Sequence, residues 1–177
     1  MLAELGERLV VLERTRESFL DSVRASSDSQ RGFRPLVGAW SMLDVTEHLV
    51  LAEEKSLLGI LKGPRPGTRV TPVAQVRMAA VRLVLASSLR VKVPVPTVVP
   101  EGKASLDELE ARWKAAHRGV AGALEPITIV DAGAARFRHP LAGWVTAREG
   151  LGFLVGHIRH HAVQLTRIRR APGFPSS

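Results

Sequence analysis

A chain of 177 residues, 45% of them hydrophobic and spread along its whole length, is long enough for one domain with a substantial core, which excludes a disordered protein. Lysine and arginine exceed aspartate and glutamate by 25 to 17, a formal charge of +8, but the basic residues are scattered and stacking aromatics are few, so we do not expect nucleic acid as a partner. The lack of cysteine excludes disulfides, thiolate-bound metals and a protein thiol nucleophile.

The first predicted element is an amphipathic helix over residues 2–26, in which apolar side chains recur at a helical period. Charges interrupt this stretch, so it is not a signal peptide, and no apolar run in the chain approaches the roughly 20 residues that span a bilayer. We therefore expect a cytoplasmic protein without a membrane partner. A polar linker is predicted over residues 26–35, because this stretch is rich in serine and ends at Pro35.

The second long helix is predicted to begin at Ser41, which forms a capping box with Asp44, and to end at Gly63. A shorter and less clearly amphipathic helix is predicted over residues 72–90. Three prolines in residues 91–102 then exclude an α-helix and argue against a central strand, so this segment is predicted to be an extended surface connection.

Two further capping boxes, Ser105 with Glu108 and Thr146 with Glu149, open the last two long helices. The loop FRHPLAGW at 137–144 lies between these helices, and no stretch of the chain shows convincing strand alternation. The predicted fold is all-α: a four-helix bundle with an extra helical segment and a proline-rich connection between its second and third helices. Residues 1–177 are expected to be a single domain, with about 171–177 as a C-terminal tail.

Three of the six histidines lie in HIRHHAVQL at 157–165. On a helical wheel, His157 and His161 stand one turn apart at the edge of the apolar stripe, whereas His160 lies about 100° further round and is expected to point to solvent. His157 and His161 can therefore converge on one ion, and His160 cannot join them. Two imidazoles are an incomplete set, because catalytic zinc typically has three protein ligands.

The third ligand must come from another helix, and the residues alone leave its identity open. His48 lies on the second long helix, where apolar residues cover most of the circumference and periodicity does not set its direction. His117 falls within the apolar stripe of the third long helix and is an equally good candidate on packing grounds, although a partly buried core histidine is its ordinary interpretation. His139 precedes Pro140 in a loop and is expected to be a turn residue.

Two regions of the chain resemble the DinB/YfiT-like superfamily of bacterial four-helix-bundle metalloproteins. They are WSMLDVTEHLVLAEE at 40–54 and HPLAGWVTAREGLGFLVGHIRHHAVQL at 139–165, together about a quarter of the sequence. The matching residues are Trp40, Glu47-His48-Leu49, His139-Pro140-Leu141, Gly143, His157, His161 and Gln164. Helix order and length agree with the family over nearly the whole chain.

The resemblance implies that His48, His157 and His161 bind a divalent metal, most often zinc or nickel, and that the protein is a homodimer. It also implies chemistry with a low-molecular-weight thiol such as bacillithiol, mycothiol or glutathione, as several members resemble thiol-dependent S-transferases or isomerases. The lack of cysteine fits a thiol cosubstrate, and fits a non-thiol enzyme equally well. Residues 64–102 match no family feature and are expected to border the mouth of the site.

Several other side chains are candidates for contacts around the metal. Gln164 lies on the same shoulder of its helix as the histidine pair and could hydrogen-bond a ligand or a substrate. Glu47 and Glu53 could orient an imidazole, but solvent-exposed positions are expected for both. Trp144 is expected to pack in the core rather than to line a pocket.

The leading functional hypothesis is a metal-dependent small-molecule enzyme, most concretely a transferase that moves a thiol onto an electrophile, or else a related hydrolase or isomerase. The alternative is a non-enzymatic stress-response or interaction module in which the ion is a structural staple.

Overall fold

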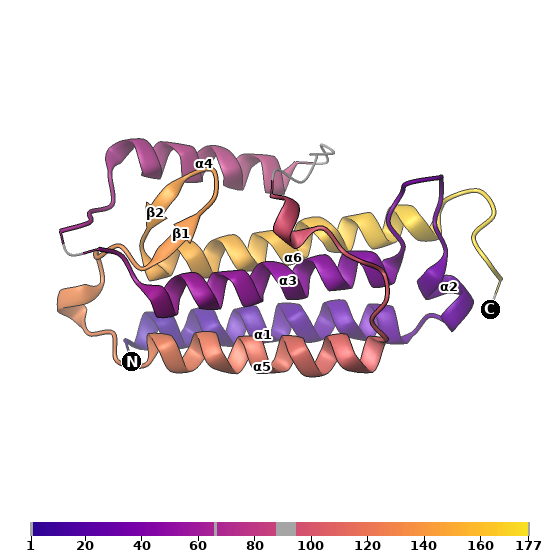
Figure 1. Ribbon diagram of the computed structural model, residues 1–177, viewed down its shortest axis with the longest axis horizontal. Helices are drawn as coiled ribbons and strands as arrows, with labels where there is room; N and C mark the ends of the chain where they lie inside the picture. Colours follow the sequence, from indigo (N-terminus) through magenta and orange to yellow (C-terminus); the bar gives the residue numbers. More distant parts are fainter. Residues whose placement is uncertain (1, 66, 88–94, 177) are drawn as a thin grey trace.

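The computed structural model describes residues 2–65, 67–87 and 95–176. Within them, four long helices lie side by side as a bundle: α1 (Ala3–Arg24), α3 (Met42–Lys62), α5 (Leu106–Leu124) and α6 (Ala147–Arg169) (Figure 1). Helix α3 packs against α5 and α1 against α6, and contacts of α3 with α6 and of α1 with α5 close the bundle. The predicted four-helix bundle with an added segment between its second and third helices is confirmed.

The apolar stripes predicted for the long helices meet in the centre of the bundle. Trp113 of α5 is completely buried, and its ring lies edge-on to Phe19 of α1 with the centroids 5.7 Å apart. Leu12, Leu109 and Leu151, one from each of three helices, are buried to 1% exposure or less. Burial of one such side chain stabilises the fold by about 1.5–3 kcal/mol.

A short helix, α2 (Asp28–Gly32), occupies part of the stretch that was expected to be a linker. The Ser27 side chain accepts a hydrogen bond from the backbone N–H of Gln30, and the Ser27 N–H donates to Gln30 Oε1 at 3.0 Å. The linker prediction is wrong here because the capping box formed by these polar residues starts a helix. The segment after α6 folds back on this helix, where Gln30 Nε2 donates to the Pro175 carbonyl at 3.0 Å.

Among its described residues, the inserted segment contains α4 (Pro72–Ala86) and the 3₁₀ turn η1 (Pro96–Val98). Figure 1 shows α4 along the outer edge of the molecule, where it packs on α6 and on the hairpin described below. The extended connection that was predicted over 91–102 contains this turn, since proline is accepted at the first position of a helical turn. Residues 88–90 of the predicted helix and 91–94 of the connection lie outside the described residues.

Two short antiparallel strands, β1 (Phe137–His139) and β2 (Gly143–Val145), precede α6. The sequence predicts only a loop here, because three residues are too few for an alternating pattern to be recognised. Nδ1 of His139 accepts hydrogen bonds from the backbone N–H groups of Leu141 and Ala142, at 3.2 and 3.1 Å. The prediction that His139 is itself a turn residue is therefore wrong: it is the last residue of β1, and its side chain accepts from the turn that follows.

Because its ring is buried, the pKa of His139 is lowered from the ordinary 6.5 to about 4. Between these values the unfolded chain binds a proton that the folded chain does not, so stability is full above pH 6.5 and falls as the pH is lowered. We expect this residue to contribute a loss of about 2 kcal/mol between pH 6.5 and about pH 4.5. Urea unfolding of wild type and His139→Asn across this range measures it, since the asparagine carbonyl can still accept in the turn. An unchanged pH slope in the variant would contradict the prediction.

Among residues 2–65, 67–87 and 95–176, no helix combines the length and apolar character that crossing a bilayer requires.

Candidate metal centre

Three histidines from two helices bring ring nitrogens to one point inside the bundle. Nε2 of His157 on α6 lies 3.1 Å from Nε2 of His48 on α3 and 3.2 Å from Nε2 of His161, one turn along α6. All three potential ligand atoms lie within 4.8 Å of one another. The structure thus brings together the residues that the family resemblance implies, and their binding of metal stays a prediction.

The outer ring nitrogens show which imidazole atoms present lone pairs. Nδ1 of His48 lies 2.7 Å from the carbonyl oxygen of Val98, and because a carbonyl can only accept, the proton of this ring is on Nδ1. Nδ1 of His161 donates in the same way to Oε1 of Gln164 at 2.7 Å. The Nε2 atoms of His48 and His161 therefore both direct lone pairs at Nε2 of His157, which can donate a proton to only one of them.

Two of the three separations between these nitrogens fit a single ion, and the third is at most 4.8 Å. Two ligand nitrogens about 2.0–2.1 Å from zinc and separated by a tetrahedral angle are about 3.4 Å apart, close to the observed 3.1 and 3.2 Å. Convergent lone pairs repel one another unless a cation lies between them. The group contains imidazoles alone, a donor type that suits zinc, copper, iron and nickel.

Burial keeps the three imidazoles in the neutral form that binds metal. Removal from water lowers the pKa of His161 to about 3, and lowers that of His48 despite its hydrogen bond to Val98. The pKa of His157 is lowered well below its usual value, first by desolvation and then by the neighbouring His161 and His48. At neutral pH the site therefore carries no charge that would oppose a cation.

Two aromatic rings form apolar walls around the imidazoles. The ring of Trp40, just before α3, lies 4.9 Å from that of His48 and 6.4 Å from that of His161. Phe153 stacks on His157 with the centroids 5.3 Å apart and the planes 16° from parallel. Sequence reasoning assigned neither ring a place in the site, although Phe153 precedes His157 by one helical turn, a spacing that places both on one face.

The two glutamates expected in solvent are buried, and that expectation is wrong. Glu47 is 6% exposed and accepts a hydrogen bond from the Gly102 N–H at 2.8 Å. Glu53 is 1% exposed and accepts one from Trp113 Nε1 at 2.6 Å. Helix α3 is enclosed by α5 and by the connection that follows η1, and this second enclosure is not encoded in the periodicity of α3 itself.

The other two helical histidines make their polar contacts outside the group of three, although the ring of His160 lies 5.4 Å from that of His161. His117 faces two carboxylates, with Nδ1 3.3 Å from Glu53 and Nε2 3.4 Å from Glu13. His160 is half-buried rather than in solvent, and its Nδ1 lies 3.1 Å from the Leu85 carbonyl, because α4 covers that side of α6.

Trp144 is half-buried in β2, paired with Arg138 of β1. Within the described part of the chain, its ring belongs neither to the main core cluster nor to the ring contacts of the three histidines. The expectation that it packs in the core is therefore wrong.

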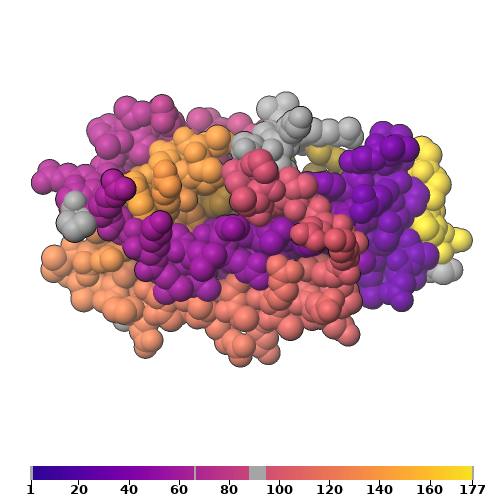
Figure 2. Space-filling view, in the orientation of Figure 1, coloured from indigo at the N-terminus to yellow at the C-terminus, as the bar shows by residue number. Residues whose placement is uncertain are grey.

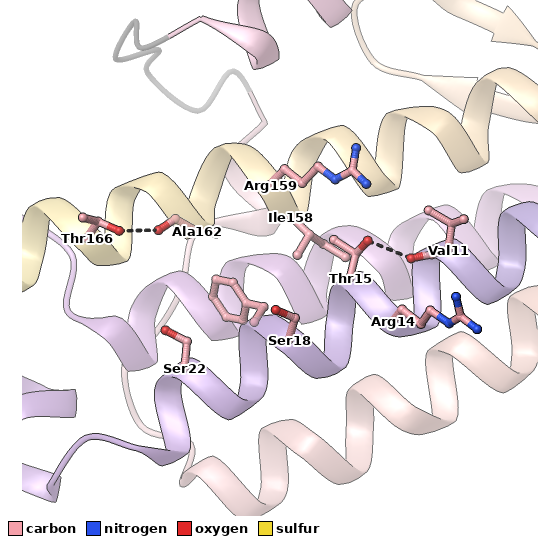
Figure 3. Close-up of a pocket in the computed structure, with 10 residues that line it drawn as sticks. Val11, Arg14, Thr15, Ser18, Ser22, Ile158, Arg159, Ala162 and Thr166 are labelled. Carbon is pink, nitrogen blue, oxygen red and sulfur yellow. Dashed lines mark hydrogen bonds between the residues drawn. The ribbon is translucent and has the colours of Figure 1, made fainter.

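A hollow of about 600 Å³ between α1 and α6 is distinct from this centre (Figure 3). Its α6 lining comes from Ile158, Arg159, Ala162 and Thr166. These positions lie about 100–200° round the helix from His157, so the hollow opens on another side of α6.

Replacing Gln164 by leucine removes the acceptor that holds the His161 ring in its tautomer and orientation. We expect metal affinity to fall by about 10–100-fold, as is usual when such an outer partner is lost. Competition with a chromophoric chelator measures the change. Gln164→Glu keeps an acceptor oxygen and should retain near-normal affinity, and equal losses in both variants would contradict this role.

A family model described as the DinB superfamily matches residues 11–165, which include all three histidines. Among solved structures, the chain is similar to one described as YfiT from Bacillus subtilis, a probable metal-dependent hydrolase with an unusual four-helix bundle topology. The two superpose with a TM-score of 0.61 at 19% sequence identity, over 99% of this chain and 91% of that one. No curated protein matches the sequence. At 19% sequence identity, this structural similarity shows the fold alone.

Proposed function

The chain belongs to the DinB superfamily, and from this premise we propose that it is a divalent-metal-dependent enzyme acting on a small molecule, with zinc or nickel held by His48, His157 and His161. The supporting observation is the convergence of the three Nε2 atoms, two of which present lone pairs set by hydrogen bonds on the far side of their rings. Three protein ligands are the number found in catalytic zinc sites, whereas closed structural sites have four.

The chain's own residues supply orientation and a dry environment. The carbonyl of Val98 and the amide oxygen of Gln164 hold two imidazoles in the ligating tautomer, while Trp40 and Phe153 exclude water from the sides of the rings. When bound, a divalent ion among neutral imidazoles acts as a Lewis acid and lowers the pKa of a water or thiol that reaches it.

The most concrete form of this proposal is S-transfer from a low-molecular-weight thiol, such as bacillithiol, mycothiol or glutathione, to an electrophilic carbon. A sulfur–carbon bond forms, the bond from carbon to the leaving group breaks, and the leaving group departs with the electron pair. The thiol proton passes to solvent. A chain without cysteine must receive its thiol from outside, and an uncharged ligand set favours an anionic sulfur at the ion.

Hydrolysis is the second candidate, because the YfiT structure of the same fold is described as a probable metal-dependent hydrolase. Water then replaces the thiol as the nucleophile at the same three-histidine site. A purely structural ion is the third reading, in which loading with metal raises the melting temperature and no turnover accompanies it.

One experiment separates these functions. Chelator-stripped protein is reloaded with zinc or nickel and incubated with monochlorobimane and each of the three thiols in turn, and the loss of free thiol is measured. A parallel series without thiol measures the hydrolysis of activated esters and amides. We expect metal-dependent thiol loss in wild type and His160→Ala, and none in His161→Ala. Hydrolysis without thiol loss would establish the second candidate, and stabilisation by metal without turnover in either series would establish the third.

A further inference from the structure

All of the chain's net positive charge lies in residues 55–100, most of which form the inserted segment between α3 and α5. This stretch contains eight basic residues and no aspartate or glutamate, which leaves 17 basic and 17 acidic residues in the rest of the chain. The eight are Lys55, Lys62, Arg65, Arg69, Arg77, Arg82, Arg90 and Lys92. The rest of the chain is thus electrically balanced, and six of these eight basic residues follow α3 in the insertion.

Helix α4, within this segment, is apolar on two opposite faces. Its inner face packs on the rest of the molecule through the buried Ala74 and Met78. Its outer face carries Val73, Val76, Ala80 and Leu83, which we call the α4 stripe; the exposed fractions of its valines and leucine are 58%, 70% and 74% in chain order. Spacings of three and four residues align these side chains along one side of the helix. A helix on the surface of a globular protein ordinarily presents polar residues there.

Two exposed arginines lie near the α4 stripe. Arg77 borders it on one side. Arg82 lies further round on the other side, and its guanidinium group is directed at α6, where a Cβ added at Gly152 would lie 3.5 Å from its Nη2. Within the described part of the chain, neither is paired with a carboxylate, and no acidic residue occurs anywhere in 55–100 that could pair with them. Long arginine side chains can reach toward phosphates at the edge of an apolar contact.

We propose that α4 docks on an anionic phospholipid surface, with the α4 stripe entering the boundary between headgroups and acyl chains and Arg77 facing lipid phosphates. A helix of this kind lies in the plane of the interface, held by buried apolar area and by attraction between basic residues and anionic lipid. Figures 1 and 2 show α4 at one long edge of the molecule, outside the four bundle helices. The absence of a spanning apolar run led us to expect no membrane partner, but a helix that lies in the interface needs no such run.

Other occupants fit these features less well. Residues 55–100 contain no aromatic side chain to stack on bases, and an apolar stripe gains nothing from a phosphate backbone. The spacing of the α4 stripe would also suit pairing with a second copy. That pairing, however, would bring arginines of both copies together without a carboxylate from either insertion. The surface of an acidic protein would supply negative charge for the basic residues, but it has no acyl layer for the α4 stripe to enter.

Flotation of the full chain with vesicles tests the proposal. We expect at least about tenfold stronger binding to phosphatidylcholine vesicles containing phosphatidylglycerol than to phosphatidylcholine alone, and weaker binding as salt is added. The double variant Val76→Gln/Leu83→Gln should lose at least about tenfold, and Arg77→Gln about fivefold. Val163→Gln on α6, where the native side chain is 48% exposed, is the matched control and should bind as wild type does.

Thermal unfolding followed by circular dichroism checks that each variant is folded. Vesicle binding that does not depend on phosphatidylglycerol, or that is unchanged in Val76→Gln/Leu83→Gln, would overturn the proposal. A dimer without vesicles that dissociates in this variant, combined with no vesicle binding, would identify a second copy as the occupant instead. Binding to polyglutamate but not to vesicles would point to an acidic protein and would equally overturn it. None of these outcomes depends on metal or on turnover.

Discussion

Replacing His157 or His161 by alanine will abolish metal binding, whereas replacing His160, which lies between them in the sequence, will leave it intact. The Nε2 atoms of the first two meet Nε2 of His48, but the ring of His160 faces the Leu85 carbonyl of α4. Loss of an outer partner alone reduces metal affinity by about 10–100-fold, so loss of a ligand should exceed about 100-fold. Elemental analysis and chelator competition on purified protein measure the stoichiometry and affinity.

His48→Ala tests the same site from α3. It should match the α6 variants, because the ion is held across the two helices. His117→Ala is its control: this histidine was an equal candidate for the third ligand on packing grounds, but it faces Glu53 and Glu13. Full metal content in His48→Ala, or its loss in His117→Ala, would show that the ion is bound elsewhere.

Alanine at Gly150 will destabilise the protein by about 2–3 kcal/mol, the upper part of the range for overpacking a core. A Cβ at this position on α6 would collide with the ring of Phe137 and lie only 2.8 Å from the Cβ of that residue. Phe137 is 3% exposed and is held in β1 opposite Val145, so it cannot move without disturbing the hairpin. The free energy of unfolding in urea is the appropriate measure.

Gly152, two residues along α6, is the matched control. A Cβ there would lie 3.5 Å from the flexible end of Arg82, an ordinary contact. Alanine at an unhindered helix position stabilises by about 0.5–1 kcal/mol relative to glycine. We therefore expect the two glycine-to-alanine changes to have opposite signs. A similar loss of stability in both variants would mean that glycine is needed on this face of α6 for a reason other than contact with Phe137.

The helices could be predicted because their signals are local. Ser41, Ser105 and Thr146 each accept the N-cap hydrogen bond that their capping boxes predict. The apolar stripe of α5 faces the core from Leu106 to Leu124 as its period requires. Such signals act within one or two helical turns, so neighbouring residues in the sequence are sufficient to specify them.

The metal site could be predicted only in part from the residues. Helical spacing places His157 and His161 side by side on α6, and it separates His160 from them. The choice between His48 and His117 depends on which faces of α3 and α5 point toward α6, a relation between helices that no single helix encodes. The family resemblance indicated His48 as the third ligand. In the structure its Nε2 lies 3.1 Å from Nε2 of His157.

The sequence by itself thus determined the long helices, their buried faces and the histidine pair, because these follow from local hydrogen bonding and periodicity. Only the tertiary structure decided what depends on neighbours from distant segments. It buried Glu47 and Glu53, placed α4 over His160, and brought the Val98 carbonyl to His48 across fifty residues of chain. The physical reason is that side-chain period sets a direction relative to one helix axis, whereas the packing of whole helices sets what lies in that direction.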